Sequence, residues 1–276
     1  MIDSAYYRVP GAKPALVSAF LKKECAKLHA NGTLFSRMRE WDSKHFGVGV
    51  GSIDYLDSRA NAKDLNTALE WLKKNGAKCV FARPPASDAS LTALLEKAGF
   101  RVMDCLATFG GAPRDGAEFE ETANEAAKIG AASQADERGI RSIAANAFQF
   151  DHFHADSRFP KTKSDSLFAE WAADCLHKKT VLVERGERGQ RTSGGVEGFV
   201  TCGFDSFLHF GRIDLIAVKT PRKGIGRRLV EGALSWFHGK TSFVLVGTQT
   251  QNPATRLYHS AGLAPLFAQY SMHCWL

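Results

Sequence analysis

The chain has 276 residues, of which 44% are apolar, so it can bury a sizeable core and can form two domains. Its net charge is +7, but the basic residues are scattered apart from clusters at 177–179 and 219–228. No basic tail and no alternation of basic and aromatic residues is present. These features argue against a partner that is nucleic acid and favour small anionic ligands.

The sequence also argues against a membrane or secreted protein. No stretch reaches about 18 uninterrupted apolar residues, and the first residues lack the pattern of a secretory signal. Six cysteines occur singly, without a CxxC pair and mostly in apolar surroundings, which favours reduced thiols over disulfides or zinc ligands. We therefore expect a cytoplasmic protein, either a monomer or a homodimer, with no metal.

Two parts of the chain share one order of elements. ALEWLKKNGAKCVF (68–81) and ALSWFHGKTSFVLV (233–246) each indicate the end of an amphipathic helix, a polar turn and an apolar strand. LTALLEKAGFRVMDCLATF (91–109) and ATRLYHSAGLAPLFAQYSM (254–272) each indicate a helix that ends at Gly, followed by a strand. The order strand, helix, strand, helix, strand thus occurs twice, which predicts a duplicated fold. Chance likeness between two α/β units is the alternative.

The two copies differ at the start of their first helix. The second has KTPRKGIGRRL (219–229), with two glycines among basic residues, whereas the first has DSRANAKDL (57–65). A helix start offers unpaired backbone N–H groups and a partial positive charge, which suit a phosphate, although a Gly-rich turn beside a solvated basic helix end would look the same. The second copy also has Tyr258 where the first has Leu95. We expect the second copy to bind an anionic cofactor and the first to serve another role.

The segment between the copies predicts a strand near 126–133, a helix near 136–147 and a helix near 164–177, with a polar, aromatic loop at 148–163. Two strands are then expected, at 179–185 and 196–203, joined by a surface turn.

The segments IDLIAVKTPRKGIGRRLV (213–230) and VGTQTQNPATRLYHSAGL (246–263), in this order, resemble the GNAT superfamily of acyl-CoA-dependent N-acyltransferases. The resemblance covers roughly residues 125–276. It implies an α/β (α+β) fold with a mixed, splayed sheet that holds acetyl-CoA between two parallel strands. The expected domains are an N-terminal degenerate half-GNAT domain at 1–115, on the side of the acceptor substrate, and an acetyl-CoA-binding catalytic domain at 120–276.

The resemblance implies cofactor contacts along the strand end, the Gly-rich loop and the start of the last helix, at Ile216, Ala217, Val218, Arg222, Lys223, Gly224, Ile225, Gly226, Arg227, Gln251 and Asn252. The sequence departs from the family pattern at two places. Pro221 stands where the family has Arg or Gln, and the family's Asn falls on Gln251 by spacing, with Asn252 one residue later. Either amide is a candidate. We expect Gly226 to lie at the surface.

Acetyl transfer to an amine needs a neutral amine, a donor to the oxyanion and a proton for the departing thiolate. The resemblance implies Tyr258 as the general acid, and a tyrosine that only packs its ring at the helix end is the alternative. The oxyanion donor is expected to be the backbone N–H of Val218 or Ala217. His154 is a candidate base, but its segment could equally be a hydrogen-bonded loop cap or bind substrate, and a water relay could replace it.

Over the full chain, REWDSKHFG (39–47) and FQFDHFHADSRF (148–159) are similar to sugar-nucleotide N-acetyltransferases of the TDP-fucosamine acetyltransferase type. This implies a nucleotide-linked amino-dideoxy sugar as substrate, in surface polysaccharide biosynthesis. Candidate substrate-binding residues are Trp41, Asp42, His45, Arg83, Asp151, His152 and Arg158. Trp41 could instead belong to the core of an early strand. The alternative functions are acetylation of another small-molecule or protein amine, and a non-catalytic acyl-CoA-binding module.

Overall fold

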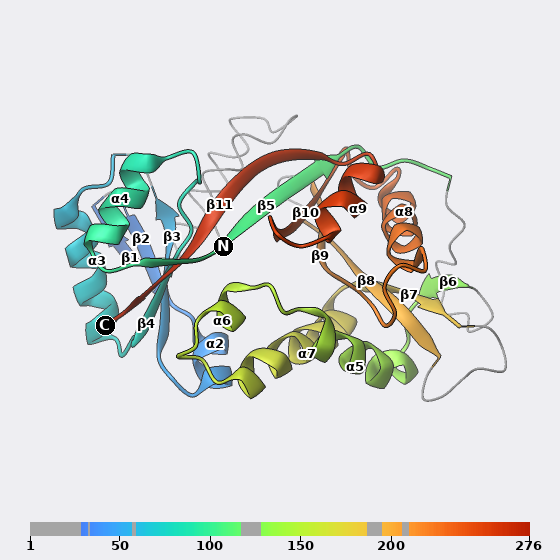
Figure 1. The fold of residues 1–276 in the computed structure, drawn as a ribbon, viewed down its shortest axis with the longest axis horizontal. Coiled ribbons are helices and arrows are strands. Elements are labelled where there is room, and N and C mark those ends of the chain that lie inside the picture. The colour runs from blue at the N-terminus through green and yellow to red at the C-terminus, as the bar shows by residue number, and fades with distance from the viewer. Residues whose placement is uncertain (1–28, 33, 57–58, 117–127, 187–194, 206–209) are drawn as a thin grey trace. The chain divides into compact units, whose positions relative to one another are not determined.

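The duplicated order of elements predicted from the sequence is present in the computed structural model (Figure 1). The structure describes residues 29–32, 34–56, 59–116, 128–186, 195–205 and 210–276. The first copy consists of β3 (Val50–Leu56), α3 (Ala62–Lys74), β4 (Cys79–Ala82), α4 (Ala89–Lys97) and β5 (Arg101–Gly111). The second consists of β9 (Phe210–Val218), α8 (Ile225–Phe237), β10 (Phe243–Gln249), α9 (Ala254–Ser260) and β11 (Ala264–Trp275).

The other elements precede the first copy or lie between the two copies. They are β1 (His29–Asn31), β2 (Leu34–Met38), α2 (Glu40–Phe46), β6 (Ile129–Ala131), the short 3-10 helix η2 (Gln134–Asp136), α5 (Glu137–Ala147), α6 (His152–Ala155), α7 (Lys161–Lys178), β7 (Thr180–Arg185) and β8 (Val196–Asp205). The predicted helix near 136–147 and the strands near 179–185 and 196–203 are present. Most of the expected turn between β7 and β8 lies outside the described residues.

The chain divides into two compact units that are not consecutive in sequence. The described residues up to 107, with 150–160 and 266–276, form unit 1; residues 108–149 and 161–265 supply unit 2. The reason lies in strand pairing, because the end of β11 pairs with β4, with Met272 opposite Ala82 and Trp275 opposite Cys79. The expected division at 115–120 therefore differs from the units: segments 150–160 and 266–276 of the expected second domain belong to unit 1. The roles of the two parts stay predictions.

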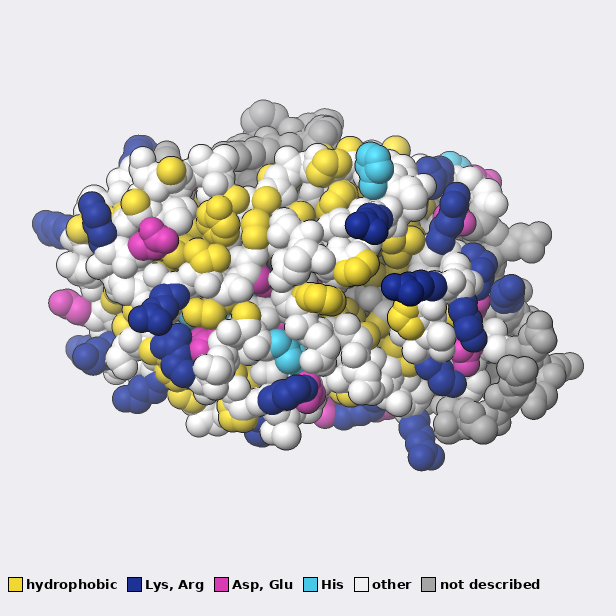
Figure 2. Space-filling model, viewed as in Figure 1, with side chains coloured by type: hydrophobic (Ala, Val, Ile, Leu, Met, Phe, Trp, Pro, Cys, Tyr) yellow, Lys and Arg dark blue, Asp and Glu magenta, His cyan; other side chains and the backbone are white. Residues whose placement is uncertain are grey.

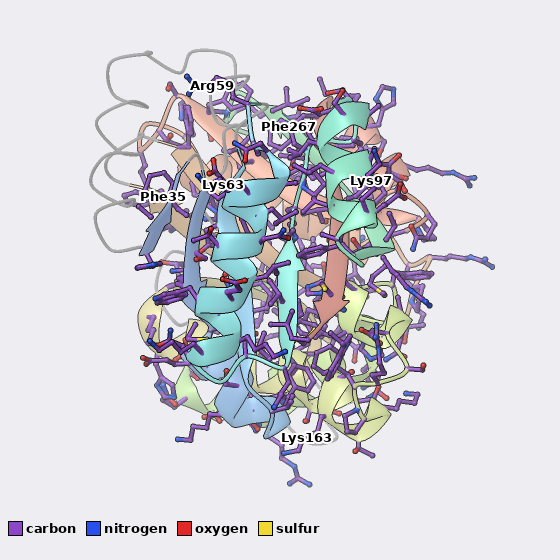
Figure 3. All side chains as sticks on the ribbon, turned by 90° about the vertical axis from the view of Figure 1, so that its left-hand side faces the viewer. Phe35, Arg59, Lys63, Lys97, Lys163 and Phe267 are labelled. Atoms are coloured by element: carbon purple, nitrogen blue, oxygen red, sulfur yellow. The ribbon has the colours of Figure 1, made fainter. Side chains whose placement is uncertain are left out.

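The sheet of unit 1 has the strand order β1-β2-β3-β4-β11. All neighbours are antiparallel except β3 and β4, which are parallel. Helices α3 and α4 cover one face of this sheet (Figure 3). Their buried residues pack against the strands in one hydrophobic core, which includes Leu65, Leu72, Leu91, Leu95, Ile53, Val80 and Met272. Burial of such side chains is the main source of stability in this unit.

Two helices of the chain lie where the sequence did not predict them. Segment 39–47 forms α2, so the alternative of an early strand is wrong. The expected loop at 148–163 contains α6, because the carboxylate of Asp151 accepts the backbone N–H groups of Phe153 and His154 and so caps a short helix. Helix α7 then begins at Lys161 rather than near 164.

Unit 2 has the strand order β5-β10-β9-β8-β7-β6. The pairs β6–β7, β7–β8 and β8–β9 are antiparallel, and the pair β9–β10 is parallel. Helix α8 lies close to this sheet because two strand glycines leave room for it. A Cβ atom at Gly198 would lie 2.9 Å from Ile225 and Leu229, and one at Gly211 would lie 2.7 Å from Phe237.

Surface and cysteine features agree with the sequence pattern. On the face shown in Figure 2, Lys and Arg side chains are spread in small groups, with Asp and Glu among them. No described helix is both long enough and apolar enough to cross a membrane. The five cysteines within the described residues form no disulfide, and Cys25 lies outside that part of the chain.

The contact between β3 and the turn after α3 generates a stability prediction. A Cβ atom at Gly49 would overlap the carbonyl oxygen of Gly76, whereas one at Gly47 would meet nothing within 4 Å, although Gly47 has φ of 73°. We expect Gly49→Ala to lower the free energy of unfolding by about 2–3 kcal/mol, and Gly47→Ala by about 1 kcal/mol through strain alone. Urea unfolding of both variants checks this, and equal midpoints would contradict it.

Candidate functional site

The parallel pair β9–β10 in unit 2 separates before either strand ends. Their ladder runs from Phe210 opposite Phe243 to Ile213 opposite Val246. Strand β9 continues to Val218 and β10 to Gln249, while β9 stays paired with β8 as far as Val218. In the described part of the chain, the second half of β9 therefore has a hydrogen-bonded neighbour on the β8 side and none on the β10 side.

The backbone groups that face the opened side can be assigned from the alternation of an antiparallel ladder. The N–H of Lys219 donates to the carbonyl of Glu197 on the β8 side, and the N–H of Leu215 donates to the side chain of Thr201, also on β8. Residue 217 shares this direction, so the N–H of Ala217 faces β8. The backbone groups of Ile216 and Val218 face the opposite way. Of the two expected oxyanion donors, only Val218 points to the opened side.

A β-bulge lies next to the point where the ladder ends. The register between β8 and β9 shifts between Val200 and Cys202. The extra residue is in β9, where Asp214 and Leu215 stand opposite the single residue Thr201. Thr201 is fully buried, and its hydroxyl accepts the N–H of Leu215 at 2.9 Å and donates to the Leu215 carbonyl at 3.4 Å. The side chain thus replaces a missing backbone pair. Bulges bend strands and occur often beside functional sites, and this one sets the direction of β9.

Helix α8 begins at Ile225 without a side-chain cap, because its N-cap residue is Gly224 in the left-handed conformation, with φ of 75°. The first N–H groups of a helix have no intrahelical partner, so those of α8 remain available for an anion. Arg222, two residues earlier, has φ of 66°, the one positive value found for a described residue other than Gly. Such strain is retained where the surrounding structure requires it.

The charges around this helix start differ in their partners. Arg222 and Lys223 are exposed and have no acidic partner among the described residues. Arg227 pairs with Glu231 at 2.9 Å, one turn further along α8. Arg228 binds the buried carboxylate of Glu184 on β7 through two nitrogens, at 2.6 and 3.0 Å. This bidentate pair fixes the first turn of α8 to the sheet.

Gly226 is packed rather than free at the surface. A Cβ atom there would lie 3.2 Å from Leu257 of α9 and 3.8 Å from Val218 of β9. Gly226 was expected at the surface; the structure has it half-buried, and the Leu257 side chain would have to move by a few tenths of an ångström to admit a Cβ atom. Glycine at this position lets α8, α9 and the end of β9 approach one another, as close packing of a loop against a strand requires.

The corresponding helix start in the first copy is closed by side chains. Helix α3 begins after Asn61, whose side-chain amide oxygen accepts the backbone N–H of Asp64 at 3.0 Å. Asp64 adds a negative charge within the first turn. This arrangement satisfies a helix N–H group and repels a phosphate. The contrast supports the expectation that only the second copy has an anion site.

Tyr258 of α9 is buried, with 2% of its surface exposed, and its ring contacts that of Phe109. Burial raises the pKa of its phenol well above the usual value, so the phenol carries its proton at neutral pH. Near the start of α9, the side chain of Asn252 accepts the N–H of Ala254 at 3.0 Å, so it serves the helix. Gln251 is exposed. Of the two candidate amides, Gln251 is the one whose side chain extends into solvent.

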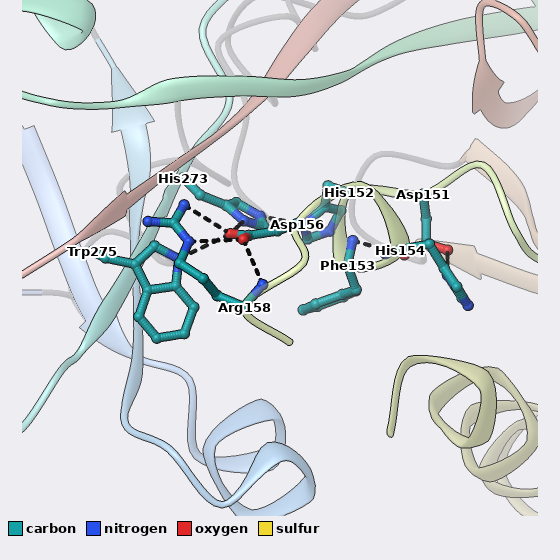
Figure 4. Close-up of polar contacts among 8 residues, drawn as sticks. All are labelled: Asp151, His152, Phe153, His154, Asp156, Arg158, His273 and Trp275. Carbon is teal, nitrogen blue, oxygen red and sulfur yellow. Dashed lines mark hydrogen bonds and ion pairs between the residues drawn. The ribbon is translucent and has the colours of Figure 1, made fainter. Parts of the chain in front are cut away.

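In unit 1, the candidate residues of segment 150–160 belong to a polar cluster around Asp156 (Figure 4). The carboxylate of Asp156 accepts hydrogen bonds from Nδ1 of His273 at 2.8 Å, Nε1 of Trp275 at 2.9 Å and Nε of Arg158 at 2.9 Å. Arg158 also lies over the Trp275 ring, 4.9 Å from its centroid. Burial alone would raise the pKa of Asp156, but these hydrogen bonds outweigh it and hold the pKa well below its usual value. Arg158 is thus committed to an internal partner.

The other candidates of unit 1 divide into structural and exposed residues. Asp42 is buried and accepts from Nε of Arg39 at 2.7 Å. The Trp41 ring is 47% exposed and stacks on His45, with centroids 5.5 Å apart. Nδ1 of His154 is hydrogen-bonded to the carboxylate of Asp151, the cap of α6. Trp41 and His45 therefore offer an accessible aromatic surface, whereas Asp42 and Asp151 serve the fold.

A trio in unit 1, Cys79, Asp156 and His273, has ligand atoms within 4.8 Å of one another. The sequence did not predict it. Both ring nitrogens of His273 are engaged, one by Asp156 and one by His152, and the guanidinium of Arg158 already balances the carboxylate. Burial raises the pKa of the Cys79 thiol far above its usual value. These contacts do not suit a metal ion, which needs free lone pairs and a thiolate.

Comparisons with known proteins give no match in sequence but clear matches in structure. No family model and no curated protein matches the chain. A GCN5-related N-acetyltransferase from Kribbella flavida superposes with a TM-score of 0.60 at 13% identity, over 95% of each chain. The fold is that of the GCN5-related N-acetyltransferases. At this identity the likeness establishes the fold, and the expected mixed-sheet GNAT fold is confirmed.

Two further structures with the GCN5-related fold are informative. A tandem GNAT protein of the clavulanic acid biosynthesis pathway has a TM-score of 0.54 at 11% identity, over 83% of this chain and 76% of that one. The glucosamine N-acetyltransferase region of a fungal multi-domain β-N-acetylglucosaminidase has a TM-score of 0.57 at 14% identity. That match covers 87% of this chain and 31% of the fungal one.

Several site residues escaped the sequence analysis. Thr201 and Glu184 lie on strands that were predicted, but neither stands out in an apolar strand pattern. His273 follows Met272 within the last strand, and a histidine among apolar residues was the signal that could have marked it. Its partner Asp156 lies 117 residues earlier, so no local pattern joins the two.

The bulge predicts a specific cost for removing one hydroxyl group. Thr201→Val keeps the shape of the side chain but leaves the N–H of Leu215 buried without its partner, which costs about 1–3 kcal/mol. Thr201→Ser keeps the hydroxyl and serves as the matched control, with a smaller loss from the missing methyl group. Thermal unfolding of the two variants measures the difference. A Val variant as stable as the Ser variant would show that the hydroxyl does not hold β9.

Proposed function

We propose that this protein is an acetyl-CoA-dependent N-acetyltransferase. The observation that carries the proposal is the end of the β9–β10 ladder at Ile213 and Val246, beyond which the backbone of β9 faces an opened side. The uncapped start of α8 follows the end of β9 directly in the chain. A pantetheine arm needs backbone partners like an added strand, and a pyrophosphate needs free N–H groups. Unit 2 provides both.

The residues of unit 2 fit acetyl-CoA as follows. The first-turn N–H groups of α8, with Arg222 and Lys223 beside them, would hold the pyrophosphate. The backbone of Ile216 would pair with the pantetheine amides, and Gln251 is available for further contacts. Acetyl-CoA supplies the activated thioester. The Val218 N–H would donate to the thioester oxygen as negative charge develops on it, which favours the transition state over the ground state.

Tyr258 would donate a proton to the departing sulfur. Since burial raises the pKa of its phenol, the donor form is present over the whole neutral and mildly basic range. Burial also keeps the ring fixed against Phe109, so that the hydroxyl is positioned without a large entropy cost. If Tyr258 only filled space, phenylalanine at the same position would serve equally well.

We further propose that unit 1 binds the acceptor substrate and that this acceptor is an amino sugar. More specifically, we propose a nucleotide-linked amino-dideoxy sugar of surface polysaccharide biosynthesis. Two observations support an amino sugar: the exposed, stacked Trp41 and His45, which suit a sugar ring or base, and the likeness to a glucosamine N-acetyltransferase region. The anion-repelling start of α3 supports a role for unit 1 other than cofactor binding.

The acceptor is found by mass spectrometry of products. The full chain is incubated with acetyl-CoA and a panel of amines: glucosamine, nucleotide-linked amino sugars, polyamines and peptide N-termini. Acetylation of the sugar amines, with Trp41→Ala raising their KM, is expected. Acetylation of polyamines or peptides alone would support the acetyltransferase function but contradict an amino sugar as the acceptor. Cofactor binding without any acetylated product would favour a non-catalytic acyl-CoA-binding module.

The anion site predicts a charge effect that can be separated from folding. Asp and Asn both tolerate the positive φ of Arg222, so Arg222→Asp and Arg222→Asn should fold alike. An acid near a helix start stabilises the helix but repels a phosphate. We expect Arg222→Asp to weaken coenzyme A binding about tenfold or more relative to Arg222→Asn, by calorimetry at low salt. Equal affinities of the two variants would show that the pyrophosphate does not bind at this loop.

The proposed general acid predicts a loss in rate rather than in binding. Tyr258→Phe keeps the ring and its contact with Phe109, and should lower kcat by ~10²–10⁴-fold with little change in acetyl-CoA affinity or melting temperature. Because the pKa of the phenol is raised, the unmodified protein should show no loss of activity from its ionisation below pH ~10. Full activity of the Phe variant would show a structural tyrosine.

A further inference from the structure

A chain of hydrogen bonds through buried side chains of unit 1 ends at His152 (Figure 4). The carboxylate of Asp156 lies 2.8 Å from Nδ1 of His273, and Nε2 of His273 lies 2.7 Å from Nδ1 of His152. His273 is fully buried, and His152 retains 8% exposure. Nε2 of His152 has no hydrogen-bond partner among the described residues.

The direction of each hydrogen bond follows from the charge of its members. The Asp156 carboxylate is ionised and can only accept, so Nδ1 of His273 carries a hydrogen. Burial lowers the pKa of His273, although the hydrogen bond to Asp156 opposes the shift, so the ring is neutral and Nε2 has a lone pair. Nδ1 of His152 must therefore donate to it. The pKa of His152 is also lowered by burial, and its Nε2 presents a lone pair.

The same chain can move a proton inward without placing a charge on His152. When Nε2 of His152 gains a proton, the Nδ1–H bond of His152 breaks and an N–H bond forms on Nε2 of His273. His273 then carries both protons, and the positive charge rests beside the Asp156 carboxylate. His152 is left neutral in its other tautomer. In a catalytic triad, a carboxylate orients the base. Here a second histidine, His273, stands between the base His152 and the carboxylate of Asp156.

The charges around the chain favour this final position. Arg39, which follows β2, and Arg83, which follows β4, both disfavour a positive charge on His152. Asp104 on β5 and Asp156 both favour a positive charge on His273, while Arg158 disfavours it. A proton received at His152 is thus stabilised at His273 rather than where it arrives.

We propose that His152 takes the proton from the amine of the acceptor substrate, with His273 and Asp156 as the relay that stores it. The proposal rests on the proposed acetyltransferase function and identifies its general base. It applies to an acceptor whose amine still carries the proton that must be removed. It differs from the expectation that His154 is the base. Nδ1 of His154 is hydrogen-bonded to the carboxylate of Asp151, the residue that caps α6.

The relay is tested in the full chain without any substrate. Long-range nitrogen–proton NMR of 15N-histidine protein reports which ring nitrogen carries hydrogen, and assignment through the ring carbons needs no substitution. At pH 7 we expect His152 and His273 to be neutral, each with its hydrogen on Nδ1. On acidification, His273 should become doubly protonated first, while His152 changes to the Nε2–H form. His152 with its hydrogen on Nε2 at pH 7, or doubly protonated before His273, would overturn the relay.

The catalytic part is tested by the pH profile of His152→Gln, with the amine of the panel that is acetylated fastest. At pH 7 its kcat/KM for the amine should fall by ~10²–10⁴-fold, and the loss should shrink about tenfold per pH unit as solvent deprotonates the amine. Acetyl-CoA affinity should not change. His29→Gln, a histidine stacked on Trp71 elsewhere in unit 1, is the control and should keep the parent profile.

Two outcomes separate this inference from the function on which it rests. A pH-dependent loss in His154→Gln, with none in His152→Gln, would overturn the choice of base while leaving acetyl transfer intact. Failure of the unmodified chain to bind coenzyme A would refute the proposed acetyltransferase function, whatever tautomers the histidines show.

Discussion

The end of hydrogen bonding between two parallel strands is the constraint on which the candidate site depends. A buried backbone group needs a partner, so a strand that leaves its neighbour inside a sheet is stable only if something else satisfies it. On the β8 side, Thr201 supplies part of that compensation for Leu215. On the β10 side, Ile216 and Val218 remain directed at an opened edge, where an extended ligand with amides of its own can pair with them.

The helix that follows this strand is held in register with the same edge. Gly198 and Gly211 let α8 approach the sheet, Gly226 lets its first turn approach β9 and α9, and the bidentate pair between Arg228 and Glu184 fixes it there. In the first copy Gly51 of β3 likewise makes room for Leu72 of α3, but the start of α3 is capped by the side chain of Asn61. The two copies of one fold thus differ where chemistry is expected. One presents free N–H groups beside basic residues, and the other closes its helix with a side chain.

Much of this arrangement could be predicted from the sequence, and the remainder depends on contacts that no local pattern records. Helical periodicity and Gly punctuation give the repeated elements and the loop at 219–229, because these signals are local. The exchange of β11 into unit 1 could not be predicted, because β4 and β11 pair across most of the chain. The bulge at Thr201 depends on the register of β8 against β9, which alternation alone does not specify. The helix at Glu40–Phe46 could not be predicted, because segment 39–47 has too few apolar residues to distinguish a helical period from a strand period.

The central claim, that the backbone of β9 is open to a ligand beyond Ile213, is tested most directly by amide hydrogen exchange at single residues, with and without acetyl-CoA. The account predicts fast exchange at Ile216 and Val218 in the free protein and strong protection once acetyl-CoA is bound, while the amide of Ala217, which faces β8, is protected in both states. Protection of Ile216 and Val218 already present in the free protein, or no change on adding acetyl-CoA, would contradict it.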